Sequence, residues 1–190
     1  TALILGDRMG GRLAFHVHST EWGRQAQSPS PIVMRWENAL GRQAAAVITV
    51  STAMCADLAA HGWDDRRVHA VWNGVDTGVY TPTSPGRATV RARYGLEKHT
   101  PVALFVGRLV PVKGILQLAQ AWPSVVARHA NARLVLLGTG ELEETVREGF
   151  MSAGVADTVT MRTEFVSEAE RIAHYLASDV VVLPSTYEPF

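Results

Sequence analysis

Short runs of Val, Leu and Ile alternate along this chain with longer stretches whose apolar residues have helical spacing. This alternation is typical of βαβ units, in which successive strands run parallel. Most of the runs are continuously apolar, so helices are expected to cover both faces of the sheet. The sequence therefore predicts an α/β fold with Rossmann-like parallel sheets. The predicted strands are residues 13–18, 46–50, 68–72, 102–106, 133–137, 158–161 and 179–183.

Helical stretches lie between these strands, and each opens with a plausible capping residue or an acidic first turn. Ser167 followed by Glu170 has the spacing of a capping box, in which two side chains satisfy backbone N–H groups at a helix start. The segment that follows Ser167 is therefore predicted to be helical. The predicted helices are residues 31–44, 53–61, 113–128, 141–153 and 168–177.

A polar stretch rich in Gly, Pro, Ser and Thr begins at Asn73 and interrupts the alternation. Such a stretch is typical of an interdomain linker. We assign residues 1–75 to one α/β domain, residues 76–86 to the linker and residues 87–190 to a second α/β domain. The chain begins without the strands that should flank residues 13–18, and it stops just after a strand end. We therefore expect both domains to be incomplete.

The charges of the chain balance, with 18 Lys and Arg against 18 Asp and Glu. No overall field draws it to nucleic acid or to an anionic membrane, so an anionic ligand must meet a local site. The single cysteine, Cys55, excludes an internal disulfide framework and a cysteine-built zinc site. It suits a reducing compartment, so we predict a cytoplasmic location. The apolar runs are far shorter than the ~20 residues that span a bilayer, and we expect neither a membrane span nor a signal peptide.

The first candidate site follows the predicted strand 102–106. Gly107 and Arg108 come directly after the strand, and Lys113 opens the next helix. A helix N-terminus favours anions through its N–H groups and its dipole, and two nearby cations would strengthen the binding of a phosphate or diphosphate. The pattern is not a P-loop, because the eight residues from Gly107 do not end in Gly-Lys-Ser/Thr. Position alone allows equally that Arg108 and Lys113 are solvated surface cations.

A second glycine-rich turn, Gly138-Thr139-Gly140, follows the predicted strand 133–137. Glycines allow a ligand to approach the backbone closely. A dinucleotide fingerprint would need a third glycine where Glu143 stands, so the pattern gives little support to a NAD site. Taken by themselves, these residues favour the simpler interpretation of a tight turn between strand and helix.

Glu188 lies just after the last predicted strand and precedes Pro189. A following proline favours extended backbone, which could direct the carboxylate into the crevice at the carboxyl ends of the strands. Since most glutamates are simply solvated, an exposed loop carboxylate is the alternative that the residue alone favours.

Two histidines, His16 and His18, lie at the end of the first predicted strand. They share a strand face, so a metal site with Glu21 is geometrically possible. No further ligand has a suitable spacing, and we expect no metal site. The favoured interpretation packs His16 within the strand and leaves His18 at its tip, facing the cleft.

In order and spacing, these motifs resemble the family-4 retaining glycosyltransferases, nucleotide-sugar enzymes with the two-domain GT-B fold. The resemblance covers nearly the whole chain and implies a partial GT-B architecture, with an acceptor-side domain followed by a nucleotide-sugar-binding domain. Residues 15–24 look most like the glycogen-synthase-like branch. The residues that carry the resemblance are His18, Val50-Ser51, Met54, Asn73-Gly74-Val75-Asp76, Gly107-Arg108, Lys113-Gly114, Gly138-Thr139-Gly140, Ser178-Asp179, Leu183-Pro184-Ser185 and Glu188-Pro189-Phe190.

The resemblance implies how the nucleotide sugar would be held. Arg108 and Lys113, in the loop that starts at Gly107, would bind the donor diphosphate and neutralise the leaving group. Val166 and the turn at residues 138–140 would border the nucleotide. The expected donor is an ADP-, UDP- or GDP-sugar, and no metal or other cofactor is required.

The resemblance also implies how the sugar would be held and transferred. Glu188 matches the first carboxylate of the family's Glu-x7-Glu motif, which contacts hydroxyls of the transferred sugar, and His18 matches a histidine that lines the sugar subsite. Transfer would retain the anomeric configuration, with a carbohydrate or other hydroxyl compound as acceptor and glucan synthesis as one possible role. The second Glu of the motif would fall beyond Phe190, so we expect this chain alone not to turn over.

Two alternatives stay open at this point. A GT-B-fold epimerase of nucleotide sugars would share the diphosphate site, although it needs acid and base carboxylates that the sequence does not identify. A non-catalytic nucleotide-binding module could be built on the same fold, because a fold does not determine a function.

Overall fold

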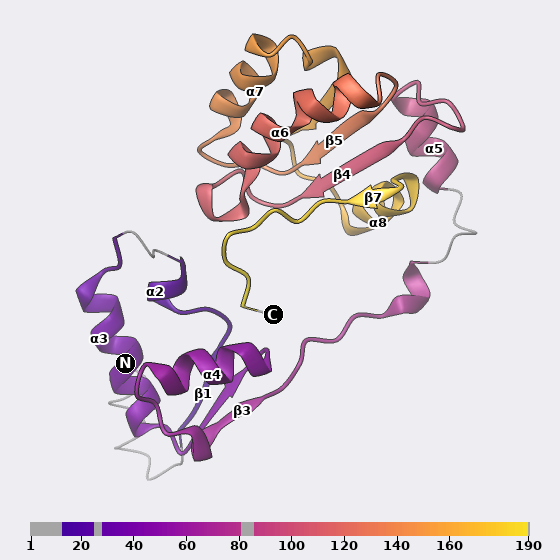
Figure 1. Cartoon of the computed structure of the whole chain (residues 1–190). Coiled ribbons are helices and arrows are strands. Elements are labelled where there is room, and N and C mark those ends of the chain that lie inside the picture. Colours follow the sequence, from indigo (N-terminus) through magenta and orange to yellow (C-terminus); the bar gives the residue numbers. More distant parts are fainter. Residues whose placement is uncertain (1–12, 25–27, 81–85, 190) are drawn as a thin grey trace. The chain divides into compact units, whose positions relative to one another are not determined.

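A computed structural model of the chain describes residues 13–24, 28–80 and 86–189 (Figure 1). The chain divides into two compact units. Unit 1 comprises Thr1–Val75 with Tyr187–Phe190, and unit 2 comprises Asp76–Thr186. The sequence analysis assigned residues 187–190 to the second domain instead. Within the predicted linker 76–86, the structure has a 3-10 helix at Thr77–Val79, while residues 81–85 lie outside the described part.

Unit 1 contains a three-stranded parallel sheet with the order β1-β2-β3. Val17 of β1 lies opposite Thr49 of β2, and Val47 of β2 lies opposite Val68 of β3, so β2 is the central strand. The elements are β1 (Ala14–Val17), α2 (Glu21–Arg24), α3 (Pro31–Gln43), β2 (Ala46–Thr49), α4 (Thr52–Ala60), a 3-10 helix (Asp65–Arg67) and β3 (Val68–Ala70).

The core of unit 1 is built around the central strand. Val47 and Leu58 are fully buried, and Trp63 packs into the same cluster. A Cβ atom at Gly41 of α3 would lie 2.4 Å from the Trp63 ring, which explains why only glycine fits there. The indole N–H of Trp63 donates to Asn38 Oδ1 at 2.9 Å, so the ring is buried with its polar atom satisfied.

Unit 2 contains a four-stranded parallel sheet with the order β6-β5-β4-β7. Its elements are α5 (Gly86–Arg93), β4 (Val102–Val106), a 3-10 helix (Pro111–Lys113), α6 (Ile115–Arg128), β5 (Arg133–Leu137), α7 (Glu143–Ser152), a 3-10 helix (Ala156–Thr158), β6 (Val159–Arg162), α8 (Glu168–Ala177) and β7 (Val180–Val181).

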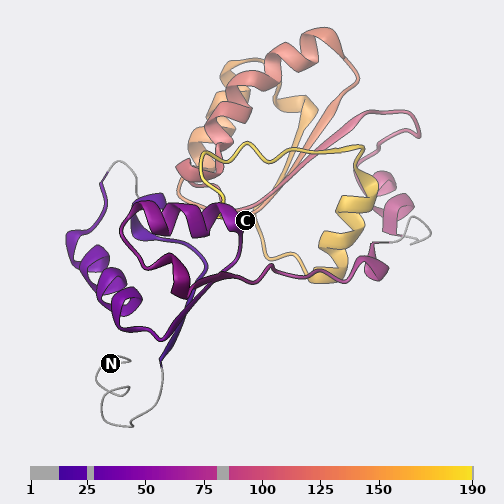
Figure 2. The ribbon, with the colours of Figure 1, turned by 60° about the horizontal axis from the view of Figure 1, so that its bottom comes forward.

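Helices cover both faces of the unit 2 sheet, as the continuously apolar strands predict. Leu134 and Leu136 of β5 join a core cluster with α6 and α7, whereas Val135 and Leu137 point the other way and pack near Tyr175 of α8. Figures 1 and 2 show α6 and α7 on one face and α5 and α8 on the other. The α/β class with parallel sheets is therefore confirmed.

Several predicted boundaries shift by one or two residues, some of them for local reasons. Helix α6 begins at Ile115 and not at residue 113, because Gly114 has left-handed backbone (φ 66°) that separates the preceding 3-10 turn from the helix. Strand β7 is confined to Val180–Val181, and Pro184, which has no N–H to donate, follows it. Helix α7 begins at Glu143, two residues later than predicted.

Helix α5 (Gly86–Arg93) is an α-helix of unit 2 that the sequence analysis does not predict. It has few apolar residues, and its buried positions include Val90 and Arg91. Arg91 is only 6% exposed because its guanidinium donates to backbone carbonyls, among them those of Ala177 (2.9 Å) and Thr100 (2.7 Å). A buried cation with carbonyl partners leaves no trace in hydrophobic periodicity, which is why the pattern missed this helix.

The predicted capping box at the start of α8 is half formed. Ser167 Oγ accepts a hydrogen bond from Glu170 N–H at 3.2 Å, as predicted. The Glu170 carboxylate forms ion pairs with Arg93 and with Arg162 (3.2 Å). These bonds tie α8 to α5 and β6, so a residue expected to act locally has a tertiary role.

His174 of α8 is 1% exposed, and both of its ring nitrogens have hydrogen-bond partners. The Glu170 carbonyl, 2.7 Å from Nδ1, can only accept, so Nδ1 carries the proton and Nε2 accepts from the Tyr94 hydroxyl at 2.8 Å. Burial lowers the pKa of His174 below its ordinary value.

This lowered pKa predicts a loss of stability in mild acid. The unfolded chain binds a proton at His174 more readily than the folded chain does. The contribution of neutral His174 to the free energy of unfolding is therefore complete above its ordinary pKa of about 6.5, and it is lost as the pH falls toward the lower pKa of the folded state. Urea unfolding followed by circular dichroism at pH 7.5 and 5.5 would measure it. The His174→Gln variant should lose part of this pH dependence, whereas His129→Gln, at an exposed site, should keep it. Equal pH dependence in both variants would contradict the assignment.

Candidate functional site

The loop after β4 carries the predicted cations and is tied to the loop after β5 by backbone hydrogen bonds. Gly107 N–H donates to Leu137 O at 3.0 Å, and Leu109 N–H donates to Thr139 O at 2.8 Å. The parallel ladder of β4 and β5 therefore continues past the strand ends. Leu109 is fully buried, so it anchors the loop while its neighbour Arg108 is exposed.

The two cations precede the start of a helix. Arg108 follows Gly107 at the carboxyl edge of the sheet, and Lys113 ends the 3-10 turn that leads into α6. Gly114 is the N-cap of α6 and provides no side-chain hydrogen bond to the first turn. Among the residues that the structure describes, no ion pair involves Arg108. A helix start of this kind offers N–H groups, a positive dipole end and cationic side chains to one anion.

Glycines at this edge permit backbones to approach one another. Gly138 has φ 147°, and a Cβ atom there would lie 1.9 Å from Gly107 O. At Gly140 the Cβ atom would lie 2.3 Å from Leu109 O. The two glycines thus form a tight turn between strand and helix, as the residues alone favoured. Contact of Gly138 and Gly140 with a nucleotide stays a prediction.

The loop between β6 and α8 holds Val166 and a residue that the sequence analysis missed. Gly138 N–H donates to Arg162 O at 3.0 Å, so this loop starts beside the glycine turn. Val166 is half-buried, whereas Phe165 is 91% exposed. An aromatic residue within the polar segment Arg-Thr-Glu-Phe-Val-Ser is a signal that could have identified it.

The loop after β7 approaches α6. A Cβ atom at Gly114 would lie 1.9 Å from Pro184 O, and Thr186 N–H donates to Val112 O at 2.9 Å. The segment that starts at Tyr187 belongs to unit 1. Unit 2 therefore brings together Gly107, Arg108, Lys113, Gly138, Gly140 and Val166 at the carboxyl ends of neighbouring strands.

Glu188 belongs to unit 1, where its neighbours tether it. Ser51 Oγ donates to Pro189 O at 2.5 Å and also accepts from Met54 N–H as the N-cap of α4. The Tyr187 hydroxyl lies 3.5 Å from Thr20 Oγ1. Glu188 is exposed between these two anchors. Exposure is compatible both with a carboxylate directed into a crevice and with a solvated loop carboxylate.

His18 is exposed just after β1, at the carboxyl edge of the unit 1 sheet. The prediction that His16 packs within the strand is wrong, because His16 is exposed and its ring centroid lies 4.1 Å from that of His18. Strand β1 pairs with β2, and His16 lies on a strand face that the described residues of unit 1 leave exposed.

The structure gives no support to a metal site formed by these histidines with Glu21. The Glu21 carboxylate accepts a hydrogen bond from Ser30 N–H at 2.9 Å and pairs with Arg24 at 3.1 Å. These partners hold the pKa of Glu21 below its usual range. In the described ranges no three His, Cys, Asp or Glu side chains are grouped to hold a metal ion. None of the helices in the described part of the chain has the length and apolar character of a membrane span.

A parallel sheet with helices on both faces and a cationic loop at the carboxyl ends of its strands defines a class of nucleotide-binding α/β proteins. Comparison with known sequences narrows this class. The model of the family described as Glycosyl transferases group 1 matches residues 86–190, and that of Glycosyltransferase Family 4 matches residues 1–79. The chain therefore belongs to the group 1 glycosyl transferases, and its fold is that of the family-4-like GT-B enzymes.

Relatives of the chain are longer glycosyltransferases. An uncharacterized glycosyltransferase of Methanocaldococcus jannaschii is 30% identical over 180 residues, which cover 92% of this chain and 46% of the relative. A GDP-mannose-dependent alpha-(1-6)-phosphatidylinositol monomannoside mannosyltransferase of Mycolicibacterium smegmatis is 30% identical over 183 residues, which cover 95% of this chain and 46% of the relative. The chain spans about half the length of these relatives.

Solved structures show the same fold. Anabaena HepE, crystallised in complex with UDP and glucose, matches with a TM-score of 0.83 and 22% identity. The match covers 98% of this chain and 50% of HepE. At this identity the likeness concerns the fold, so the ligands of HepE are a property of that protein.

Substitution of Gly114 should destabilise unit 2. Gly114→Ala would force left-handed backbone on a residue with a Cβ atom that meets the Pro184 carbonyl, and we expect a loss of about 2 to 4 kcal/mol in the free energy of unfolding. Gly149→Ala is the matched control, because open space surrounds Gly149 in α7 and alanine should stabilise the helix by about 0.5 to 1 kcal/mol. Urea unfolding would measure both changes, and similar values for the two variants would refute the role of Gly114.

Proposed function

We propose that this chain holds the nucleotide-sugar site of a retaining glycosyltransferase, which transfers a sugar from a nucleoside-diphosphate sugar to a carbohydrate or another hydroxyl acceptor. The observation that carries the proposal is the loop after β4, in which Arg108 and Lys113 lead into a helix whose N-cap residue, Gly114, makes no side-chain hydrogen bond to the first turn. The family membership of the chain supports the same activity.

The departing diphosphate sets the main electrostatic requirement of this reaction. Negative charge builds up on the leaving phosphate as the bond to the sugar breaks, so groups that bind this charge lower the barrier. Arg108 provides a fork of N–H donors, Lys113 a compact charge and α6 its first N–H groups. The position of the loop backbone supports this role, since Leu109 is buried and Gly114 lies close to the Pro184 carbonyl.

The nucleotide would lie across the carboxyl edge of unit 2. Neighbouring strands are about 4.8 Å apart, so the loops after β4 and β6 are separated by roughly 10 Å, enough for a diphosphate at one and a base at the other. In this arrangement the turn at residues 138–140 borders the ribose and Val166 borders the base. The exposed Phe165 ring would stack on the base. Stacking accepts any base, so an ADP-, UDP- or GDP-sugar fits equally.

The sugar and the acceptor would be bound by residues of unit 1. Glu188 would accept hydrogen bonds from hydroxyls of the transferred sugar, and His18 would line the same subsite. Both side chains are exposed in unit 1, which supports these roles. Glucan synthesis and the cytoplasmic location stay predictions.

Removal of the two cations tests the proposal. Isothermal titration with ADP, UDP and GDP should reveal binding by the chain, and Arg108→Ala with Lys113→Ala should weaken the tightest of them at least about tenfold, since charge-assisted bonds to phosphate are lost. Arg128→Ala, at the opposite end of α6, is the matched control and should retain the affinity. Equal affinity of the double variant and the control, with both folded by circular dichroism, would refute the diphosphate site.

Replacement of Phe165 tests the orientation of the nucleotide. Phe165→Ala should weaken UDP binding by about 1 to 3 kcal/mol through lost stacking, while pyrophosphate binding should stay unchanged. Phe165→Trp should retain the affinity for UDP. An equal loss for UDP and pyrophosphate would place the diphosphate and not the base beside Phe165.

A further inference from the structure

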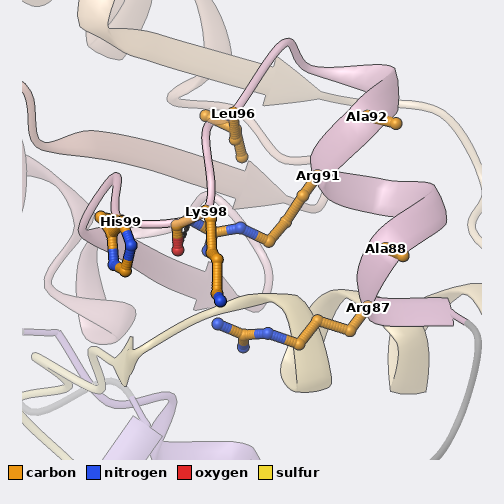
Figure 3. Close-up of a pocket in the computed structure, with 7 residues that line it drawn as sticks. All are labelled: Arg87, Ala88, Arg91, Ala92, Leu96, Lys98 and His99. Atoms are coloured by element: carbon orange, nitrogen blue, oxygen red, sulfur yellow. Dashed lines mark hydrogen bonds between the residues drawn. The ribbon is translucent and has the colours of Figure 1, made fainter.

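A hollow of about 610 Å³ lies at the other end of the unit 2 sheet, away from the loop that carries Arg108. One wall is helix α5, and the other is the segment that joins α5 to Val102, the first residue of β4 (Figure 3). The hollow therefore lies at the amino ends of the strands. One strand length, about 15 Å, separates this edge from the edge where the nucleotide is proposed to bind.

Arg91 fixes the shape of the hollow. Its guanidinium donates to the carbonyls of Glu97 (2.6 Å), Lys98 (3.3 Å) and Thr100 (2.7 Å), so the joining segment is folded around a buried cation. Arg91 Nε is buried and, within the described part of the chain, has no hydrogen-bond partner. The wall that carries Lys98 is thus held in place by Arg91 and is a built part of unit 2.

Positive charge exceeds negative charge around the hollow. Arg87, Arg91 and Lys98 line it, and the carboxylate paired with them is that of Asp179, 3.2 Å from Arg87 and 3.6 Å from Arg91. No ion pair of the described residues involves Lys98. Glu97, its neighbour in the chain, is exposed and does not line the hollow. Three cations against one carboxylate leave an excess of two positive charges.

Two of these cations converge from opposite walls. Figure 3 shows the side chains of Arg87, from α5, and Lys98, from the joining segment, reaching toward one another at one side of the hollow. Arg87 donates to Leu176 O (2.6 Å) and to Asp179, which leaves further N–H donors of its guanidinium for a ligand. Converging like charges repel each other unless an anion lies between them.

We propose that this hollow binds a small organic phosphate monoester. The phosphate lies between Arg87 and Lys98, where a guanidinium fork and an ammonium can share its oxygens. The organic part lies over the apolar wall of Ala88, Ala92 and Leu96. The volume suits a small ligand and exceeds what a phosphate ion alone would occupy. This site is separate from the nucleotide edge, so both can be occupied together.

Phenyl phosphate and inorganic phosphate are suitable probes, because both carry the anion and one adds an apolar ring. Isothermal titration of the chain should show that phenyl phosphate binds more tightly than inorganic phosphate. Lys98→Gln removes an exposed charge and should weaken phenyl phosphate binding about tenfold, as expected for the loss of a charged hydrogen-bond donor to phosphate. Arg128→Gln, another exposed cation of unit 2, should leave it unchanged.

The variant with Arg108→Ala and Lys113→Ala separates this site from the proposed nucleotide site. It should bind phenyl phosphate as the unaltered chain does, and saturation with phenyl phosphate should not block a UDP titration. Loss of phenyl phosphate binding in that variant but not in Lys98→Gln would assign the anion to the nucleotide edge and overturn the proposal. Absence of binding by the folded chain would also overturn it, and equal affinity for the two probes would overturn the ester assignment in favour of free phosphate.

Discussion

The backbone ladder between β4 and β5 is the interaction on which the candidate site depends, because it does not stop where the strands end. Gly107 and Leu109 continue it by donating to Leu137 and Thr139, so the loops after the two strands are held as firmly as the sheet. Only a residue without a Cβ atom fits at positions 138 and 140, where carbonyls of the neighbouring loop would clash with a side chain. The glycine turn is thus the condition for a rigid cationic loop.

Rigidity at this edge has an electrostatic consequence. Arg108 and Lys113 precede a helix whose N-cap residue, Gly114, makes no side-chain hydrogen bond to the first turn, so presenting its N–H donors to an anion needs no costly rearrangement. At the opposite edge of the same sheet, a buried cation holds the backbone in place. There Arg91 is buried, and it folds the chain before β4 around its guanidinium through carbonyl acceptors. In unit 2, Arg108 is therefore exposed at one edge of the sheet, whereas the buried Arg91 has a structural role at the other edge.

In unit 1, the segment at residues 187–189 is held without joining a sheet. Ser51 caps α4 and at the same time donates to Pro189, while Tyr187 reaches Thr20 near α2. Gly23 contacts the Tyr187 ring so closely that a Cβ atom there would lie 2.1 Å from it. These contacts hold the residues on both sides of Glu188, and they explain why its carboxylate is exposed while its backbone is anchored.

The sequence by itself determined the α/β class, the coverage of both sheet faces by helices and the position of the cationic loop after β4. Continuous apolar runs and helical spacing are local signals, and β4, β5 and α8 follow them residue for residue. Only the tertiary structure decided the rest. One of the carbonyls that bury Arg91 is that of Ala177, 86 residues later in the chain, and the role of Gly138 depends on its close approach to Gly107 in another loop. Such contacts join positions that no local pattern relates, so packing, not periodicity, decides them.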